Sequence, residues 1–167
     1  MKLPEILNDK QKESFYSKGF TLTETLLTLA IVSILIVTAV PIFGNLQVNN
    51  QLTEAQDRLR QTFRLAQTRS IAGLNNSSHG VYIDINIGAP DNVILYQGDS
   101  YATRDTDYDR VEEISEVMFL STSILGNDIN FTRPTGKPSA TGTITISHTV
   151  SGVSTTTITS IGSVLNQ

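Results

Sequence analysis

The chain has 167 residues, a net charge of −4 and no cysteine, which excludes a disulfide, a thiolate metal site and a thiol nucleophile. This length suits one compact domain with an appendage. Residues 81–167 carry ten acidic and four basic side chains, and such an acidic outer region argues against binding to a nucleic-acid phosphate backbone.

A long apolar segment follows the N-terminal residues. No charged residue occurs between Thr25 and Thr53, and the run Leu26–Phe43 is close to the shortest length that spans a membrane as a helix. Three interpretations compete: a secretory signal peptide, a plain single-pass anchor, and a membrane helix that also assembles with other helices. No small-residue cleavage site follows the run, which argues against the signal peptide. Because lysines precede the run and no cation follows it before Arg58, we expect a cytoplasmic N-terminus.

Glu24, near the start of this segment, favours the third interpretation. A carboxylate inside a membrane segment costs a few kcal/mol, so such a residue usually has a partner. Cleavage between Gly19 and Phe20 would place a new α-amino group at the head of the helix. A neighbouring helix, shifted along its axis, could place its own amine against Glu24. The carboxylate would then set the register between two helices.

The sequence GFTLTE, followed by an apolar helix, resembles the class III leader of type IV prepilins and pseudopilins. The resemblance implies cleavage after Gly19 by a prepilin peptidase, methylation of Phe20, and an assembly role for Glu24. Pro41 falls where pilins commonly have a proline, and it predicts a helix that kinks or loosens around Val37–Gly44. Such a segment would extend within a filament. The leader of 19 residues is longer than that of many type IV pilins.

Beyond Gly44 the apolar residues keep a helical spacing. They predict one apolar stripe, formed by Leu52, Ala55, Leu59, Phe63 and Ala66. The arginines lie mostly off this stripe: Arg58, Arg60, Arg64 and Arg69. The sequence GLNNSS predicts that the helix ends near Ala72–Asn76.

The remaining sequence changes to the two-residue alternation of β-strands. It predicts strands at residues 81–87, 92–97, 116–120, 129–132, 143–150 and 154–161, the last two joined as a hairpin at Ser151-Gly152. In the first strand, Val81, Ile83, Ile85 and Ile87 are expected to share one face.

The predicted fold class is α+β. A long N-terminal helix, with a membrane-spanning first half, packs its apolar stripe on one small antiparallel sheet or on two. This is also the fold that the pilin resemblance implies. The expected divisions are a cleaved cytoplasmic leader at 1–19, a transmembrane and assembly helix at 20–43, the outer half of the helix at 44–76, and a β-domain at 77–167.

The order of HGVYIDI, VILYQG, INFTRPTGKP and a Thr-rich hairpin is similar to the GspH/FimT type of minor pilins and type II secretion minor pseudopilins. Phe131, Gly136 and Pro138 carry part of this resemblance, although the cysteine pair of many pilins is missing. It implies a structural subunit without cofactor, metal or catalytic residues. The implied partners are other pilins or pseudopilins, prepilin peptidase and an inner-membrane assembly platform. The implied location is the inner membrane, with the C-terminal domain outside the cytoplasm, and then a filament.

The stretch DTDYDRVEEISE is interpreted as a solvated acidic loop, with a calcium loop as the alternative. Asp105, Asp107, Asp109 and Glu116 occupy ligand positions of an EF-hand loop, but Arg110 stands where that loop needs a glycine.

The alternative function is a membrane-anchored surface binding module for adhesion or DNA uptake. The tail SIGSVLNQ has no Lys or Arg, and the arginines at 58–69 are interpreted as a solvated helix face or a filament contact, which argues against DNA. His79 is expected in a turn, and His148 on a strand face with Ile144, Ile146 and Val150. Neither has a nucleophile or carboxylate at a catalytic spacing, so no enzyme is predicted.

Overall fold

The computed structural model describes residues 19–166, without the side chains of residues 39–42 and 166. Most of the expected leader, residues 1–18, and the side chain of Pro41 therefore lie outside the description. The chain divides into two units, Met1–Pro41 and Ile42–Gln167, and each is described by itself.

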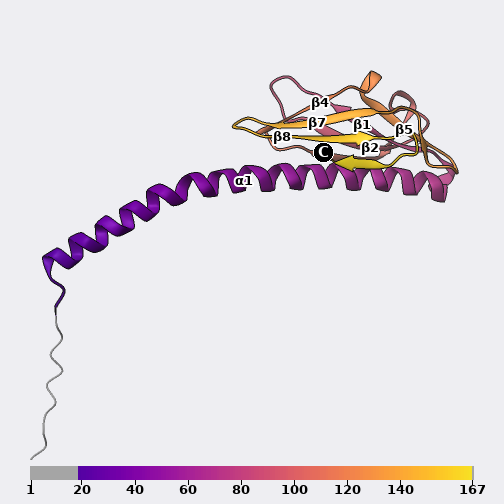
Figure 1. Cartoon of the computed structure of the whole chain (residues 1–167). Helices are drawn as coiled ribbons and strands as arrows, with labels where there is room; N and C mark the ends of the chain where they lie inside the picture. Colours follow the sequence, from indigo (N-terminus) through magenta and orange to yellow (C-terminus); the bar gives the residue numbers. More distant parts are fainter. Residues whose placement is uncertain (1–18, 167) are drawn as a thin grey trace, which may run out of the picture. The chain divides into compact units, whose positions relative to one another are not determined.

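One long helix is followed by nine strands and three short 3-10 helices within the described residues (Figure 1). In chain order they are α1 (Leu22–Ala72), η1 (Leu74–Asn76), β1 (His79–Asp84), β2 (Asn92–Gln97), η2 (Tyr101–Thr103), β3 (Asp105–Glu113), β4 (Met118–Thr122), η3 (Leu125–Asn127), β5 (Asp128–Thr132), β6 (Lys137–Pro138), β7 (Gly142–His148), β8 (Val153–Ile158) and β9 (Val164–Asn166). The α+β prediction is confirmed.

The helix ends within the predicted range. Gly73 follows Ala72 with a φ of 63°, and its N–H donates to the carbonyl oxygen of Ser70 at 3.1 Å. This left-handed conformation is strained for residues with a Cβ, which explains why a glycine stops the helix.

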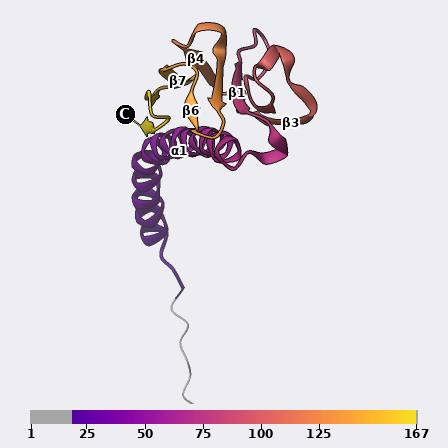
Figure 2. The same ribbon diagram turned by 90° about the vertical axis from the view of Figure 1, so that its right-hand side faces the viewer.

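The strands form two antiparallel sheets. The first has the order β3-β2-β1-β5-β6 and the second the order β4-β7-β8-β9. Figure 2 separates them beside α1, with β1 and β3 to one side and β4 and β7 to the other. The expected hairpin joins β7 and β8, whose register pairs Ser147 with Val153.

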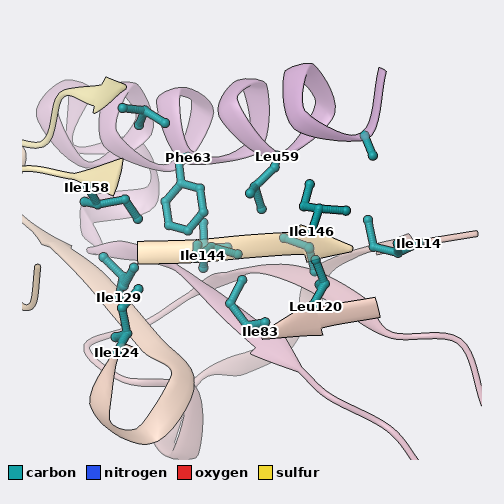
Figure 3. Close-up of a cluster of buried hydrophobic side chains, with 14 of the residues drawn as sticks. Leu59, Phe63, Ile83, Ile114, Leu120, Ile124, Ile129, Ile144, Ile146 and Ile158 are labelled. Atoms are coloured by element: carbon teal, nitrogen blue, oxygen red, sulfur yellow. The ribbon is translucent and has the colours of Figure 1, made fainter. Parts of the chain in front are cut away.

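The core of the second unit lies between the helix and the two sheets, as predicted. All five residues of the predicted stripe on α1 are buried in one cluster with strand residues such as Ile83, Ile129, Ile144 and Ile146. Figure 3 shows Leu59 and Phe63 pointing from the helix toward these isoleucines. The Phe63 ring meets the edge of Phe131 at a centroid distance of 6.4 Å, so the helix is joined to β5 as well.

The interpretation of residues 105–116 as a loop is wrong. Residues 105–113 form β3, an edge strand that pairs with β2 through Leu95 and Arg110 among others. Charged side chains suit an edge strand, because they discourage uncontrolled pairing with other chains. The extended backbone also lacks the turn that an EF-hand loop requires.

The first predicted strand is too long at its end. β1 stops at Asp84, and the side chains of Ile85 and Ile87 are exposed instead of sharing the buried face of Val81 and Ile83. Asp91 explains the change of direction, because its Oδ1 accepts the backbone N–H of Asn86 at 2.7 Å and turns the chain toward β2. The short strands β6 and β9 were not predicted.

Candidate processing and assembly site

The expected cleavage point lies just outside the helix. Gly19 and Phe20 have no regular secondary structure, and the side chain of Phe20 is 77% exposed. A peptidase needs an accessible and extended peptide bond, which a helical segment would not supply. Gly19 and Phe20 are both exposed and lie outside the helix, so the backbone between them is accessible.

Thr21 begins α1 as its N-terminal cap. Its Oγ1 accepts the backbone N–H of Glu24 at 3.2 Å, and its carbonyl oxygen accepts the N–H of Thr25 at 3.1 Å. Thr21 and Glu24 stand at the two positions of a capping box, which was not predicted from the sequence. The carboxylate of Glu24 also lies in the first turn, where the helix dipole favours a negative charge.

The hydroxyl groups of the apolar segment bond to its own backbone. Thr28 Oγ1 donates to the carbonyl of Thr25 at 2.9 Å, and Ser33 Oγ donates to the carbonyl of Leu29 at 2.7 Å. Thr38 bonds in the same way to Ile34 and Leu35. These residues therefore bring no unsatisfied hydroxyl donor into a hydrocarbon environment.

Glu24 is different from these hydroxyl residues. Among residues 19–166 it forms no ion pair, and its carboxylate is exposed. α1 contains an 18-residue window with a mean hydropathy of 2.7, none of it buried, which is long and apolar enough for a membrane span. Residues 19–38 thus present an uncovered apolar surface whose one carboxylate, that of Glu24, lies near its start.

Residues 15–40 match a family model described as the prokaryotic N-terminal methylation motif. The match supports a type IV pilin-like precursor. It includes Gly19, Phe20 and Glu24, and it ends one residue before Pro41. Such a motif implies processing by a prepilin peptidase and assembly with other pilins in general, and it fits a membrane-anchored chain. No curated protein and no solved structure matches the chain significantly.

The structure places the two histidines in β-strands. His79 was expected in a turn, but it is the first residue of β1 and is 1% exposed. Ser70 of α1 bonds to both backbone groups of His79, at 2.9 Å to its N–H and 3.2 Å to its carbonyl. Burial, followed by the charge of Arg69, lowers the pKa of the His79 imidazole. His79 therefore joins α1 to β1 as a neutral core residue.

His148 lies in β7 with Ile144 and Ile146, as predicted, whereas Val150 lies beyond the strand and is exposed. Its Nε2 is 3.0 Å from Oε1 of Gln51 on α1. This contact holds the β7–β8 hairpin against the helix.

A cluster of aromatic and polar residues on the first sheet was not predicted from the sequence. The rings of Tyr82 and Tyr101 stack with a centroid distance of 3.7 Å, and the Arg104 guanidinium lies 3.7 Å from the other side of Tyr101. Arg104 Nε donates to Asp109 Oδ2 at 2.8 Å. The cluster fastens the β2–β3 connection to the sheet. Its first and last members, Tyr82 and Asp109, are more than twenty residues apart, so no local sequence motif predicts it.

Among the arginines of α1, Arg58 lines a shallow surface groove that also contains an acidic side chain. Arg58 lines a groove of about 320 Å³ together with Arg110 and Glu112 of β3. It also pairs with Glu54 at 2.7 Å, and Arg110 pairs with Glu112. Charges of both signs therefore meet in this groove. Within the described residues, no group of three or more His, Asp or Glu side chains is arranged to hold a metal ion.

Proposed function

We propose that this chain is a minor pilin or pseudopilin, a structural subunit of a type IV pilus or type II secretion pseudopilus with no enzymatic activity. The methylation motif over residues 15–40, at the head of an uncovered apolar helix, carries the proposal. The two-sheet domain on the outer half of the helix agrees with it. Under this proposal the chain inserts with its N-terminus in the cytoplasm, is cut after Gly19 and is methylated at Phe20.

Glu24 has a defined role in this proposal. Its carboxylate pairs with the α-amine of a neighbouring subunit when the apolar helices pack together. Two features support this role: the first turn favours the ionised carboxylate, and residues 19–166 supply no ion-pair partner. Pro41 lacks the N–H that would close a helical hydrogen bond, so the helix around Val37–Gly44 extends most easily during assembly.

We assign the chain to the GspH/FimT type. This assignment rests on the sequence order described above and agrees with a nine-strand domain that ends in the β7–β8 hairpin and β9. The outer domain would lie outside the cytoplasm, anchored in the inner membrane until an assembly platform draws the subunit into a filament.

Processing is tested by the mass of the chain extracted from membranes. We expect the loss of residues 1–19 and the gain of one methyl group on Phe20. A chain that still begins at Met1 would contradict the proposal. A matched variant, Gly19→Leu, should retain the leader while its outer domain folds normally.

The capping box allows a sharper test of Glu24. Glutamine also occurs at this position of capping boxes, so Glu24→Gln keeps the capping capacity but removes the charge. Thr21→Ala removes the capping hydroxyl but keeps the charge. We expect Glu24→Gln to abolish incorporation into sheared filaments and Thr21→Ala to preserve it. The reverse pattern would mean that Glu24 acts only within its own helix.

The variants Glu24→Gln and Thr21→Ala also distinguish a filament subunit from the alternative function, a membrane-anchored binding module for adhesion or DNA uptake. Such a module needs its anchor but no register between helices, so both variants would behave as the unaltered chain. DNA binding is further disfavoured by the six net negative charges of residues 81–167. A gel-shift assay of the detergent-solubilised chain at low salt checks this point.

A further inference from the structure

Several exposed apolar side chains gather at one end of the second unit. We call this group the apolar end; its members are Ile85, Ile87, Val117, Phe119, Val150 and Val153. Ile87 is fully exposed, and the side chain of Val150 is 78% exposed. They come from or beside three connections, β1–β2, β3–β4 and β7–β8.

Hydrogen bonds hold these connections together. The N–H of Thr149 donates to the carbonyl of Val117 at 2.9 Å, which joins the β7–β8 turn to the β3–β4 turn. The buried Asp91 accepts the N–H of Asn86 through Oδ1 and that of Leu120 through Oδ2, each at 2.7 Å. It thereby joins the β1–β2 connection to β4. These hydrogen bonds fix the three connections relative to one another, so the apolar end is one ordered surface.

This end lies beside the helical residues that follow the apolar segment. His148 contacts Gln51 of the helix. Gly152 also lies close to the helix: a Cβ added to Gly152 would lie 2.7 Å from Leu52 Cδ1 and 3.6 Å from Val48 Cγ1. The strand register confirms the direction, because His148 of β7 pairs with Met118 at the start of β4. Other exposed apolar residues, Leu125 and Ile161, follow the far ends of β4 and β8.

We propose that the apolar end rests on the lipid bilayer while the chain is membrane-anchored. This inference rests on the membrane insertion in the proposed function. The bilayer is the partner that the chain itself keeps near this surface. The membrane-spanning run ends at Phe43, only a few helical turns before Val48 and Leu52. A helical rise of about 1.5 Å per residue places this level about 8–14 Å beyond Phe43.

The geometry brings the surface within reach of the headgroups. The headgroup layer is about 5–8 Å deep on each side of the hydrocarbon, and transmembrane helices tilt by about 20° on average. Val48 and Leu52 belong to the second unit and face its strands. If the helix of this unit inclines toward the membrane on that face, Val150 and Ile87 enter this layer. The transfer of apolar surface out of water stabilises the contact. Residues 85–91, 114–119 and 147–153 contain no Lys or Arg, so attraction to anionic lipid plays no part.

The test uses the absence of native cysteine. Ile87→Cys and Val150→Cys are each labelled with a nitroxide on the full chain, reconstituted in phosphatidylcholine vesicles. Leu125→Cys and Ile161→Cys are matched controls at the other end, and Leu29→Cys reports insertion of the apolar segment. Relaxation of each label by oxygen, which prefers lipid, is compared with relaxation by a water-soluble nickel chelate.

We expect the oxygen-to-nickel ratio at positions 87 and 150 to lie between that of Leu29→Cys and those of the two controls. Addition of phosphatidylglycerol or salt should leave it unchanged. Ratios equal to the controls, with Leu29→Cys in lipid, would overturn this inference and leave the proposed function standing. An aqueous Leu29→Cys would overturn both. Spin–spin broadening at positions 87 and 150 that grows with protein density would show that a second copy covers the apolar end, and would also refute the lipid contact.

Discussion

Gly80 should be the least replaceable glycine of the first sheet. It pairs directly with Tyr96 of β2, whose ring lies over it, and a Cβ at position 80 would overlap the Oη, Cζ and Cε1 atoms of that ring. A movement of the Tyr96 ring away from Gly80 would break its hydrogen bonds and disturb its packing. Tyr96 is fully buried, its hydroxyl donates to Asp128 Oδ1 at 2.6 Å, and Nδ2 of Asn130 donates to the same hydroxyl at 3.2 Å.

The cost of Gly80→Ala follows from these contacts. Overpacking a filled core costs about 1–3 kcal/mol. Loss of the hydrogen bond to the charged acceptor Asp128 adds about 1.5–3 kcal/mol. The expected decrease in the free energy of unfolding is therefore about 2.5–6 kcal/mol. For a domain of this size, the melting temperature should fall by roughly 10 °C.

The assay is urea and thermal unfolding of the full chain in detergent, followed by the near-ultraviolet circular dichroism of the tyrosines. Tyr96→Phe is the first control, because it removes the hydrogen bonds without a clash and should cost about 1.5–3 kcal/mol. Gly44→Ala is the second, because a Cβ there meets nothing within 4 Å. If Gly80→Ala unfolds within about 0.5 kcal/mol of the unaltered chain, the close packing of Tyr96 on Gly80 is refuted.

Three further predictions use the same unfolding assay. Phe63→Ala removes a fully buried ring between the helix and β5, and should cost about 3–5 kcal/mol; a much smaller loss would mean that the helix is not anchored there. Asp91→Ala leaves two backbone N–H groups without their acceptor and should cost about 3 kcal/mol, whereas Asp91→Asn, which keeps one acceptor oxygen, should cost less. The lowered pKa of His79 means that the folded chain resists protonation, so stability should be constant above about pH 6.5 and fall as the pH decreases from there toward the folded-state pKa. The variant His79→Gln should lack this loss of stability at low pH. An unchanged pH profile in that variant would show that His79 is not its cause.

The helix was predictable because its determinants are local. The spacing of Leu52, Leu59 and Phe63 already defines one face at 3.6 residues per turn, and Gly73 marks the end. The structure buries that face and ends the helix at Ala72. The Thr21–Glu24 capping box is equally local, since Thr-x-x-Glu before an apolar run is its sequence pattern.

The strands were harder because pairing partners are distant. The acidic residues at 105–116 suggested a solvated loop, with a calcium loop as the alternative. They form the edge strand β3 instead, because β2 supplies its backbone hydrogen bonds. His79 looked like a turn residue beside Gly80, until Ser70 and the strands around it placed it in the core. The Gly80–Tyr96 contact joins residues that only the sheet brings together.

The order of residues along the chain was sufficient for the methylation motif, the apolar segment, the helix and the α+β class, because each depends on neighbours within a few turns. Folding alone decided that two sheets form, that an acidic run becomes an edge strand, and that three turns unite into the apolar end. Those outcomes depend on hydrogen bonds and contacts between residues tens of positions apart, whose free energy no short stretch of sequence contains.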